Sequence, residues 1–126
     1  MAKSFGIYKC NICGNTVEMI EAYEPNVVCC GQEMKLMEEK IEEEGQEKHV
    51  PVVETNGQNI TVKVGEVPHP MQDAHFIELI ELLKDGKVIA GKWLTPTNEP
   101  KATFCLEDVQ GVSARIYCNV HGAWKN

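Results

Sequence analysis

Five side chains of types that bind transition metals could converge on a single ion. Cys118 and His121 stand three positions apart where a predicted strand ends. All four histidines lie beside a proline, a glycine or a predicted strand end, where a loop can present them: His49, His69, His75 and His121. Imidazole and thiolate together suit iron, copper or zinc. Because a closed structural zinc site takes four ligands, five candidates favour a five-coordinate metal with an open sixth position.

A second candidate metal site, made only of cysteine, lies in the N-terminal part of the chain. Cys10 and Cys13 form a C-x2-C pair, and Cys29 and Cys30 are adjacent. Four thiolates supply a tetrahedral site that suits zinc or a single iron. A zinc knuckle is one interpretation. The adjacent pair departs from the usual second C-x2-C half and should strain the tetrahedron, which favours a specialised iron site.

Composition limits the kind of protein that can carry these sites. A chain of 126 residues with 43% hydrophobic content forms one domain with a modest core, with or without a small appendage. The net charge of −7 argues against nucleic acid as a partner, because phosphate binding needs a basic surface. No apolar run approaches the ~18 residues of a membrane span, and the N-terminus lacks a signal-peptide apolar region. We therefore expect a cytoplasmic protein without membrane contact, whose cysteines bind metal rather than form disulfides.

Short strands separated by turns dominate the chain after His49. Asn56-Gly57 and Asp85-Gly86 are strong hairpin signals between apolar segments. Segment 75–83 has a helix-like composition, yet its connection through Asp85-Gly86 to the next segment favours a strand. The other predicted strands lie at 50–53, 60–64, 88–94, 102–106 and 112–118. This spacing predicts a compact antiparallel β-sandwich.

The candidate ligands lie in loops and at strand ends of this predicted sandwich. Prolines on both sides of His69 exclude it from a regular strand ladder. Cys118 ends a strand whose alternation places it on one face with Val112, Ala114 and Ile116. We therefore expect the four histidines to converge with Cys118 from loops and strand ends.

The sequence also supports predictions for several residues outside the two ligand sets. Six glutamates between residues 38 and 47 indicate a solvated connector, with Glu47 set apart because it lies just before His49. Cys105 matches no ligand pattern, and we expect it to be a small buried hydrophobic side chain. Asn119 and Gly122 are expected to shape the last ligand loop through their backbones.

These motifs resemble those of known iron proteins. Resemblance to desulforedoxin, a small rubredoxin-like iron protein, rests on Cys10-Asn11-Ile12-Cys13 and the adjacent pair Cys29-Cys30. Resemblance to the iron site of superoxide reductases rests on three motifs: Glu47-Lys48-His49-Val50-Pro51, His69-Pro70-Met71 with His75, and Cys118-Asn119-Val120-His121-Gly122. Together they make the whole chain resemble desulfoferrodoxins, the two-iron class of superoxide reductases.

The resemblance implies three segments and two iron ions per chain. Residues 1–37 would form a desulforedoxin-like domain with a tetrahedral iron, and residues 38–47 a linker. Residues 48–126 would form an immunoglobulin-like antiparallel β-sandwich with a square-pyramidal iron. The ligands of the first iron would be Cys10, Cys13, Cys29 and Cys30. Those of the second would be an axial Cys118 and an equatorial set of His49, His69, His75 and His121.

The implied activity is one-electron reduction of superoxide to hydrogen peroxide without oxygen release, as a defence against oxidative stress. Lys48 would attract superoxide and order water, and Glu47 would ligate the ferric iron after product leaves. Lys48 as an ordinary solvated lysine is the alternative. The resemblance also implies a rubredoxin-like electron donor and a homodimer.

Two other classes of protein remain open on the residues alone. An electron carrier without enzymatic activity would have a six-coordinate or closed second site, and it would react no faster than outer-sphere electron transfer allows. A zinc-binding interaction module would be colourless, and it leaves the fifth ligand unexplained. The iron and zinc content of each chain separates the zinc-binding module from the enzyme, and the rate of reaction with superoxide separates the electron carrier from it.

Overall fold

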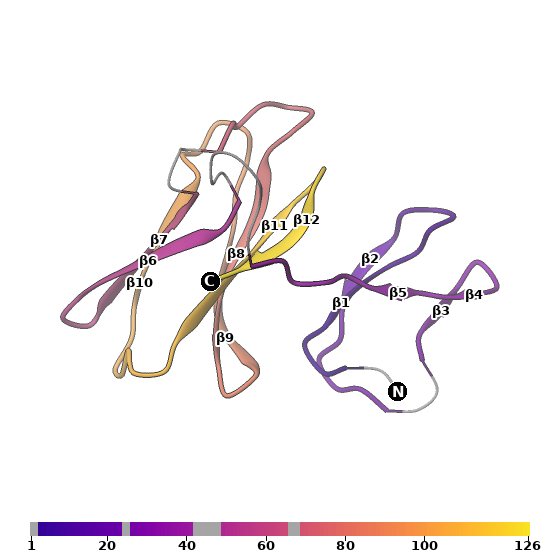
Figure 1. Ribbon diagram of the computed structural model, residues 1–126, viewed down its shortest axis with the longest axis horizontal. Helices are drawn as coiled ribbons and strands as arrows, with labels where there is room; N and C mark the ends of the chain where they lie inside the picture. The colour runs from indigo at the N-terminus through magenta and orange to yellow at the C-terminus, as the bar shows by residue number, and fades with distance from the viewer. Residues whose placement is uncertain (1–2, 24–25, 42–48, 66–68) are drawn as a thin grey trace. The chain divides into compact units, whose positions relative to one another are not determined.

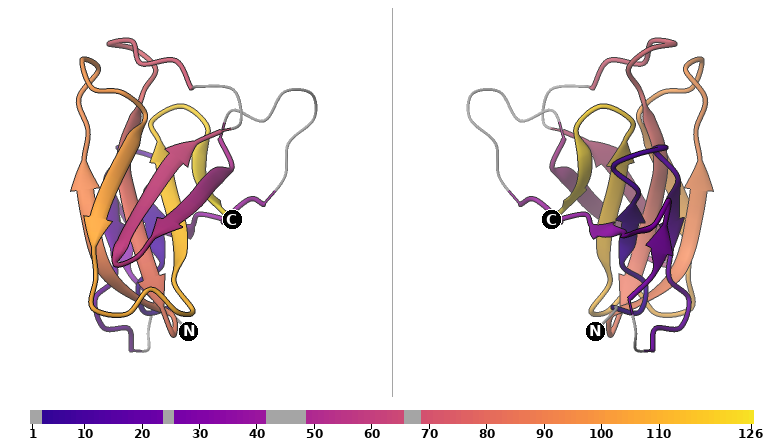
Figure 2. Two further views of the ribbon diagram at one scale, coloured as in Figure 1. Left: turned by 90° about the vertical axis from the view of Figure 1, so that its left-hand side faces the viewer. Right: turned by 90° about the vertical axis from the view of Figure 1, so that its right-hand side faces the viewer.

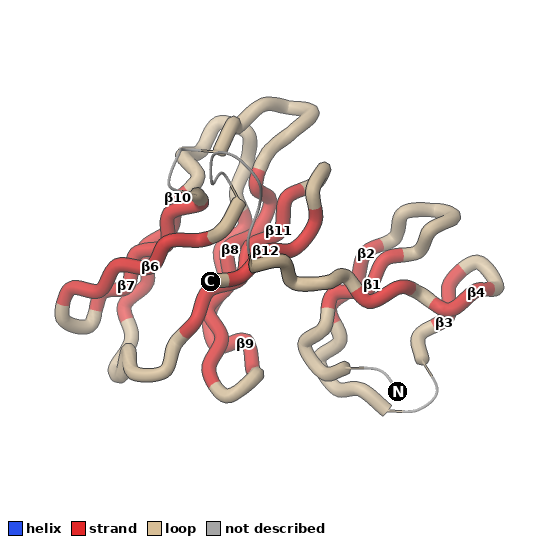
Figure 3. Tube along the Cα trace, viewed as in Figure 1, coloured by secondary structure: helices blue, strands red, loops and turns tan. Residues whose placement is uncertain are grey.

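The protein consists of β-strands joined by turns and loops (Figure 3). The structure is a computed structural model, and it describes residues 3–23, 26–41, 49–65 and 69–126. Within these ranges there is no helix, and so none that could cross a membrane. The chain divides into two compact units, Met1–Glu38 and Glu39–Asn126. The prediction of a mainly β protein is therefore confirmed.

The N-terminal unit has short strands and a very small core. One antiparallel sheet has the order β2-β1-β5, and β3 and β4 form a separate hairpin (Figure 1). The strands are β1 (Ile7–Lys9), β2 (Thr16–Glu18), β3 (Val28–Cys29), β4 (Gln32–Glu33) and β5 (Lys35–Leu36). Its cluster of buried side chains consists of Tyr8, Cys10 and Met34. So small a cluster cannot offset the chain entropy lost on folding, so a unit of this kind depends on a cross-link such as a metal ion.

Two antiparallel sheets pack face to face in the second unit (Figure 2). Their orders are β10-β7-β6 and β12-β11-β8-β9. The first comprises β6 (Pro51–Asn56), β7 (Asn59–Val64) and β10 (Lys101–Cys105). The second comprises β8 (Ile77–Lys84), β9 (Lys87–Trp93), β11 (Ser113–Cys118) and β12 (Gly122–Lys125). This arrangement confirms the predicted β-sandwich.

Tight turns set the register of the two predicted hairpins. Gly57 has a φ of +63° at the first central position of the β6–β7 turn, as a type II′ turn requires. Asp85 and Gly86 have φ values of +53° and +77° between β8 and β9. Positive φ at both central residues is typical of a type I′ turn, whose twist matches that of the strands. Segment 75–83, which was ambiguous in composition, is therefore largely strand.

Side chains that alternate along the strands fill the space between the sheets. Ala114, Ile116 and Cys118 project from β11 into this core, and each is at most 1% exposed. Ile80 of β8 pairs with Ile116 in the same sheet. The facing sheet contributes Ile60, Val62, Val64 and Ala102. Cys118 is therefore continuous with a close-packed core, which restrains the position of its sulfur.

A buried ion-pair network lies on the other face of β11. Arg115 is 1% exposed, and its Nε and Nη2 donate to Oε1 of Glu81 at 3.1 and 2.9 Å. Its Nη1 donates to Oε1 of Glu39 at 3.0 Å. Burial works against the guanidinium charge, but these two carboxylates hold the pKa of Arg115 above its ordinary value. Glu39 is thus an exception to the predicted solvated connector, most of which lies outside the described residues.

Two features of the sandwich differ from the sequence-based expectations. Cys105 is exposed, so its predicted burial is wrong. The reason is the alternation of β10, in which Cys105 shares the outward face with Lys101 and Thr103. The final strand β12 was not predicted, because it has only four residues and begins with Gly122.

Candidate metal centres

The four cysteines of the N-terminal unit converge at one point. Their sulfur atoms all lie within 4.8 Å of one another. The sulfur of Cys29 lies 3.6 Å from that of Cys13 and 3.9 Å from that of Cys30. Sulfur atoms bonded at about 2.3 Å to one tetrahedral ion lie about 3.8 Å apart. The cluster therefore has the size of a four-cysteine metal site.

Backbone N–H groups face the sulfur atoms of the first cysteine pair. The N–H groups of Ile12 and Cys13 point at Sγ of Cys10 at 3.4 and 3.5 Å. These two groups, that of Cys13 first, lower the pKa of Cys10 to about 6. The nearby thiols, that of Cys13 first, raise the pKa of Cys30 to about 12. A bound cation would allow all four thiols to ionise together, which is what a thiolate site requires.

The adjacent cysteines depend on an unusual backbone conformation. Cys30 has a φ of +53° and is followed by Gly31 at +76°. Neighbouring side chains of an extended strand point to opposite faces, so the left-handed turn at Cys30 returns its side chain toward Cys29. A non-glycine residue in this region costs roughly 1–3 kcal/mol. The adjacent cysteine pair is therefore accompanied by backbone strain at Cys30.

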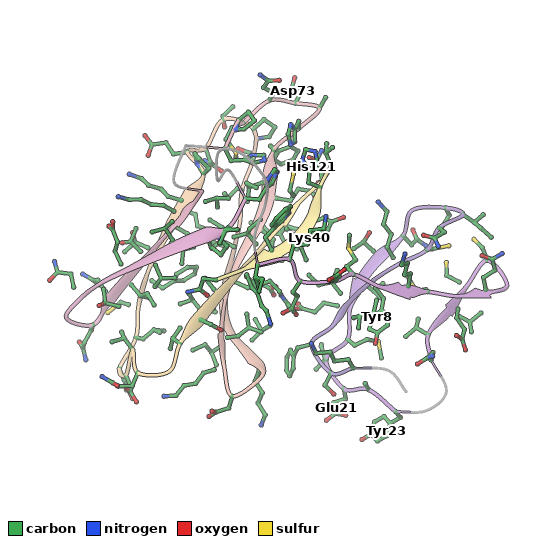
Figure 4. The ribbon with its side chains drawn as sticks, in the orientation of Figure 1. Tyr8, Glu21, Tyr23, Lys40, Asp73 and His121 are labelled. Carbon is green, nitrogen blue, oxygen red and sulfur yellow. The ribbon has the colours of Figure 1, made fainter. Side chains whose placement is uncertain are left out.

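The four histidines and Cys118 form a second group at one end of the sandwich. Their inward ligand atoms also lie within 4.8 Å of one another. His49 precedes β6, His69 and His75 precede β8, and the remaining two flank the β11–β12 turn. Cys118, His69 and His49 are 0%, 2% and 6% exposed. His121, which is labelled in Figure 4 at the β11–β12 hairpin, is exposed to solvent. The group is therefore buried on its core side and reaches solvent at His121.

Hydrogen bonds identify the imidazole nitrogens that face the centre of this group. Nδ1 of His69 donates to the carbonyl of Pro70 at 2.7 Å, which leaves Nε2 with the free lone pair. This Nε2 lies 3.0 Å from Nε2 of His49 and 3.6 Å from Sγ of Cys118. His121 presents Nδ1, at 3.9 Å from the same sulfur. The ring nitrogens of the group are thus not equivalent.

The chemistry of the donor atoms fits a transition-metal ion. Nε2 of His75 is buried and has no hydrogen-bond partner among the described residues. Burial lowers the pKa of His69 to about 4, so its imidazole is neutral at neutral pH and can donate a lone pair. Burial also raises the pKa of Cys118, and a bound cation would reverse that effect. A metal ion would therefore satisfy an orphaned nitrogen and favour the thiolate at the same time.

The side chain of Asn119 ties two ligand loops together, a role that sequence reasoning missed. Its Oδ1 accepts from the N–H of Phe76 at 3.0 Å, and its Nδ2 donates to the carbonyl of Ala74 at 3.1 Å. Its backbone N–H donates to the carbonyl of Phe76 at 3.3 Å. These bonds bracket His75 on both sides. The expected backbone role of Asn119 is therefore only part of its contribution.

Trp124 contacts the ligand loop and belongs to the core at once. Its indole ring stacks on the imidazole of His49, with ring centroids 4.7 Å apart and planes at 17°. Its Nε1 donates to the carbonyl of His121 at 3.2 Å. The rest of the side chain packs in the sandwich core and is 5% exposed. The indole therefore restrains two of the five donor residues.

Nine of the eleven predicted site residues fall into these two groups. The other two, Glu47 and Lys48, lie outside the residues that the structure describes. Their roles stay predictions.

Comparison with known proteins identifies relatives along the whole chain. The family model for desulfoferrodoxin matches residues 41–126, and the model for the desulfoferrodoxin N-terminal domain matches residues 2–37. A desulfoferrodoxin homologue of Archaeoglobus fulgidus is 51% identical over 126 residues, covering 100% of this chain and 99% of the relative. The desulfoferrodoxin of Nitratidesulfovibrio vulgaris is 48% identical, covering 99% of this chain and 98% of the relative.

A solved structure with the same fold extends over both units. The superoxide reductase from Treponema pallidum matches with a TM-score of 0.77 and 27% identity, covering 99% of each chain. The two ligand groups described above are consistent with the two iron centres of desulfoferrodoxins. The chain therefore belongs to the desulfoferrodoxin family.

Proposed function

We propose that this protein is a superoxide reductase, which converts superoxide to hydrogen peroxide by one-electron reduction and releases no oxygen. The main observation is the convergence of five donor atoms, one more than a closed four-coordinate site takes. Iron bound there would supply the electron, with thiolate ligation raising its electron density as in thiolate-ligated haem. The naming of the Treponema pallidum relative as a superoxide reductase supports this proposal.

The five-donor site has a buried side at Cys118 and a solvent-exposed side at His121, and the two sides have different roles. His49, His69, His75 and His121 hold the metal together with Cys118. The core behind Cys118 keeps water from its sulfur, so the electrostatic effect of the thiolate is not screened. The exposure of His121 leaves one edge open for a small anion to enter and for peroxide to leave.

Lys48 and Glu47 act at the open position. A protein of net charge −7 repels an anion at long range, so a local cation at the site is needed to attract superoxide. Lys48→Ala is expected to lower the second-order rate with superoxide in pulse radiolysis. Lys101→Ala is the control, because Lys101 forms an exposed ion pair with Glu99 at the start of β10. Equal rates in the two variants would contradict this role for Lys48. Glu47 would supply a carboxylate ligand to iron bound at this site.

The remaining parts of the proposal concern assembly and electron supply. Residues 1–37 form the four-cysteine iron domain, residues 38–47 the linker and residues 48–126 the catalytic domain. A rubredoxin-like protein returns the electron, and the chain works as a cytoplasmic homodimer in defence against oxidative stress. Stopped-flow reduction by rubredoxin tests the donor, and sedimentation equilibrium tests the dimer.

Metal content and reaction stoichiometry test the proposed function directly. Protein from iron-replete cells is expected to contain two irons per chain. A reductase forms one peroxide for each superoxide consumed and no oxygen. One peroxide for every two superoxides, with oxygen, would indicate a dismutase. Zinc in place of iron would favour a binding module instead.

A further inference from the structure

Lys40 contacts the last ligand loop from outside the ligand set. Its Nζ donates to the carbonyl of His121 at 2.9 Å and lies 4.8 Å from the ring centroid of Trp124. Figure 4 shows Lys40 and His121 beside the same β11–β12 hairpin. An ammonium group thus lies directly behind a candidate metal ligand.

The backbone of Lys40 is held as firmly as its side chain. Its N–H donates to the carbonyl of Ala123 at 3.1 Å, and its carbonyl accepts from the N–H of Lys125 at 2.9 Å. These bonds form a parallel bridge to Trp124 at the edge of the sheet. The preceding residue, Glu39, is bound to Arg115 as described above. Lys40 is therefore not a freely moving surface lysine, although its side chain is exposed.

Lys40 and Trp124 both bind the same donor residue, His121. Both donate a hydrogen bond to the carbonyl of His121, and the indole also stacks on His49. The N–H of His121 in turn points at Sγ of Cys118 at 3.5 Å. Fixing the His121 backbone therefore also affects the hydrogen bonding of the sulfur.

We propose that Lys40 is a positioning residue of the five-donor site, which fixes the Cys118–His121 loop and favours the ferrous state of the metal bound there. The inference rests on the proposed function, since it requires a redox-active metal. A nearby positive charge disfavours the more highly charged ferric state, and a fixed carbonyl keeps the imidazole of His121 in place. Because the ammonium is exposed, the effect on the reduction potential is moderate.

The test compares iron-loaded full-length variants. Lys40→Met is expected to lower the midpoint potential, to shift the visible charge-transfer band of the ferric thiolate and to weaken metal retention against a chelator roughly tenfold. Lys40→Arg, which keeps the charge and the donors, is expected to restore most of the potential. Lys125→Met is the matched control, because it removes the same charge from a neighbouring residue whose side chain pairs with Glu39 at 3.6 Å. Its potential should equal that of the wild type.

The outcomes separate this inference from the proposed function. A wild-type potential and band in Lys40→Met would overturn the inference, even if the iron-loaded protein reduces superoxide. An equal shift in Lys125→Met would also overturn it, because net charge alone would then explain the effect. Failure of the wild type to bind iron at this site would overturn the proposed function itself. A metal-free readout is the NMR signal of the Trp124 indole N–H, which should move in Lys40→Met; an unmoved signal counts against the inference.

Discussion

The two metal centres are built in opposite ways. The four-cysteine group draws its ligands from one short stretch, between Cys10 and Cys30, beside a buried cluster of three side chains. The five-donor group draws its ligands from segments between His49 and His121, beside a buried cluster of twelve. In the first unit the metal must stabilise the fold. In the second unit the fold positions the metal.

The difference follows from the apolar surface that each unit buries. A unit that cannot form a sufficient core gains its folding free energy from metal binding, as zinc fingers do. A sandwich with its own core can hold buried imidazoles in place before a metal arrives, so little entropy is lost on binding. The comparison therefore predicts different responses to the same perturbations.

Metal removal should have the largest effect, and it should act on the N-terminal unit alone. Structural metal sites contribute roughly 10–16 kcal/mol of apparent binding free energy, which the small core of this unit cannot replace. After chelation under reducing conditions, amide NMR signals of residues 3–38 should collapse to unfolded positions, while those of the sandwich stay dispersed. Dispersed signals from both units would show that the N-terminal unit folds without metal, contrary to this expectation.

Glu81→Gln should show that the sandwich carries its own stability. The substitution removes one of the two counter-charges of the buried guanidinium of Arg115, while Glu39 stays at 3.0 Å. The loss should therefore be smaller than the cost of an uncompensated buried charge, about 3–5 kcal/mol, but larger than that of an exposed pair. Urea unfolding of the metal-free protein measures this change. The matched control is Glu54→Gln, whose exposed pair with Lys63 is worth at most about 1 kcal/mol. Equal midpoints for the two variants would rule out the buried network as a source of stability.

Asn119→Ala should weaken metal binding at the five-donor site while leaving the four-cysteine site intact. The variant loses both side-chain bonds that bracket His75, and supporting contacts of this kind typically contribute about 10–100-fold in metal affinity. Competition with a chelator, followed separately at the two sites, measures the change. Asn98→Ala is the control, because Asn98 caps a loop through Thr95. A similar loss in both variants would show that Asn119 has no special role.

The smallest effect is expected at Asp108, on the surface of the sandwich. The N–H of Gln110 and the ammonium of Lys84 lower the pKa of Asp108 below its ordinary value of 3.8. A lowered folded-state pKa means that the carboxylate stabilises the fold above the unfolded-state pKa and stops doing so as pH falls through the folded value. Asp108→Asn should therefore reduce urea stability slightly at neutral pH and not below the folded-state pKa. A loss of stability in Asp108→Asn that is larger in acid than at neutral pH would contradict the lowered pKa of Asp108.

The two regions also differ in how much of each could be predicted. All four cysteines of the first site could be predicted as ligands from their spacing, because a short loop is enough to bring ligands together when they lie close in the sequence. The positions of Glu39 and Lys40 could not be predicted, because an acidic run indicates solvent exposure unless a buried partner such as Arg115 is known. The outward position of Cys105 depended on the register of β10 against β7, which its residue type does not specify.

The metal-binding residues, the two hairpin turns and the mainly β fold could be predicted from the sequence, because residue type, spacing and alternation are local properties. Which nitrogen of His69 faces the site could not be predicted, because it depends on where the fold places His49 and Cys118, whose donor atoms lie 3.0 and 3.6 Å from Nε2. The tertiary structure also decided that Asn119 brackets His75 and that Lys40 lies behind His121. The contacts of Asn119 and Lys40 join residues distant in the chain, and they form only when the strands of the second sheet pair.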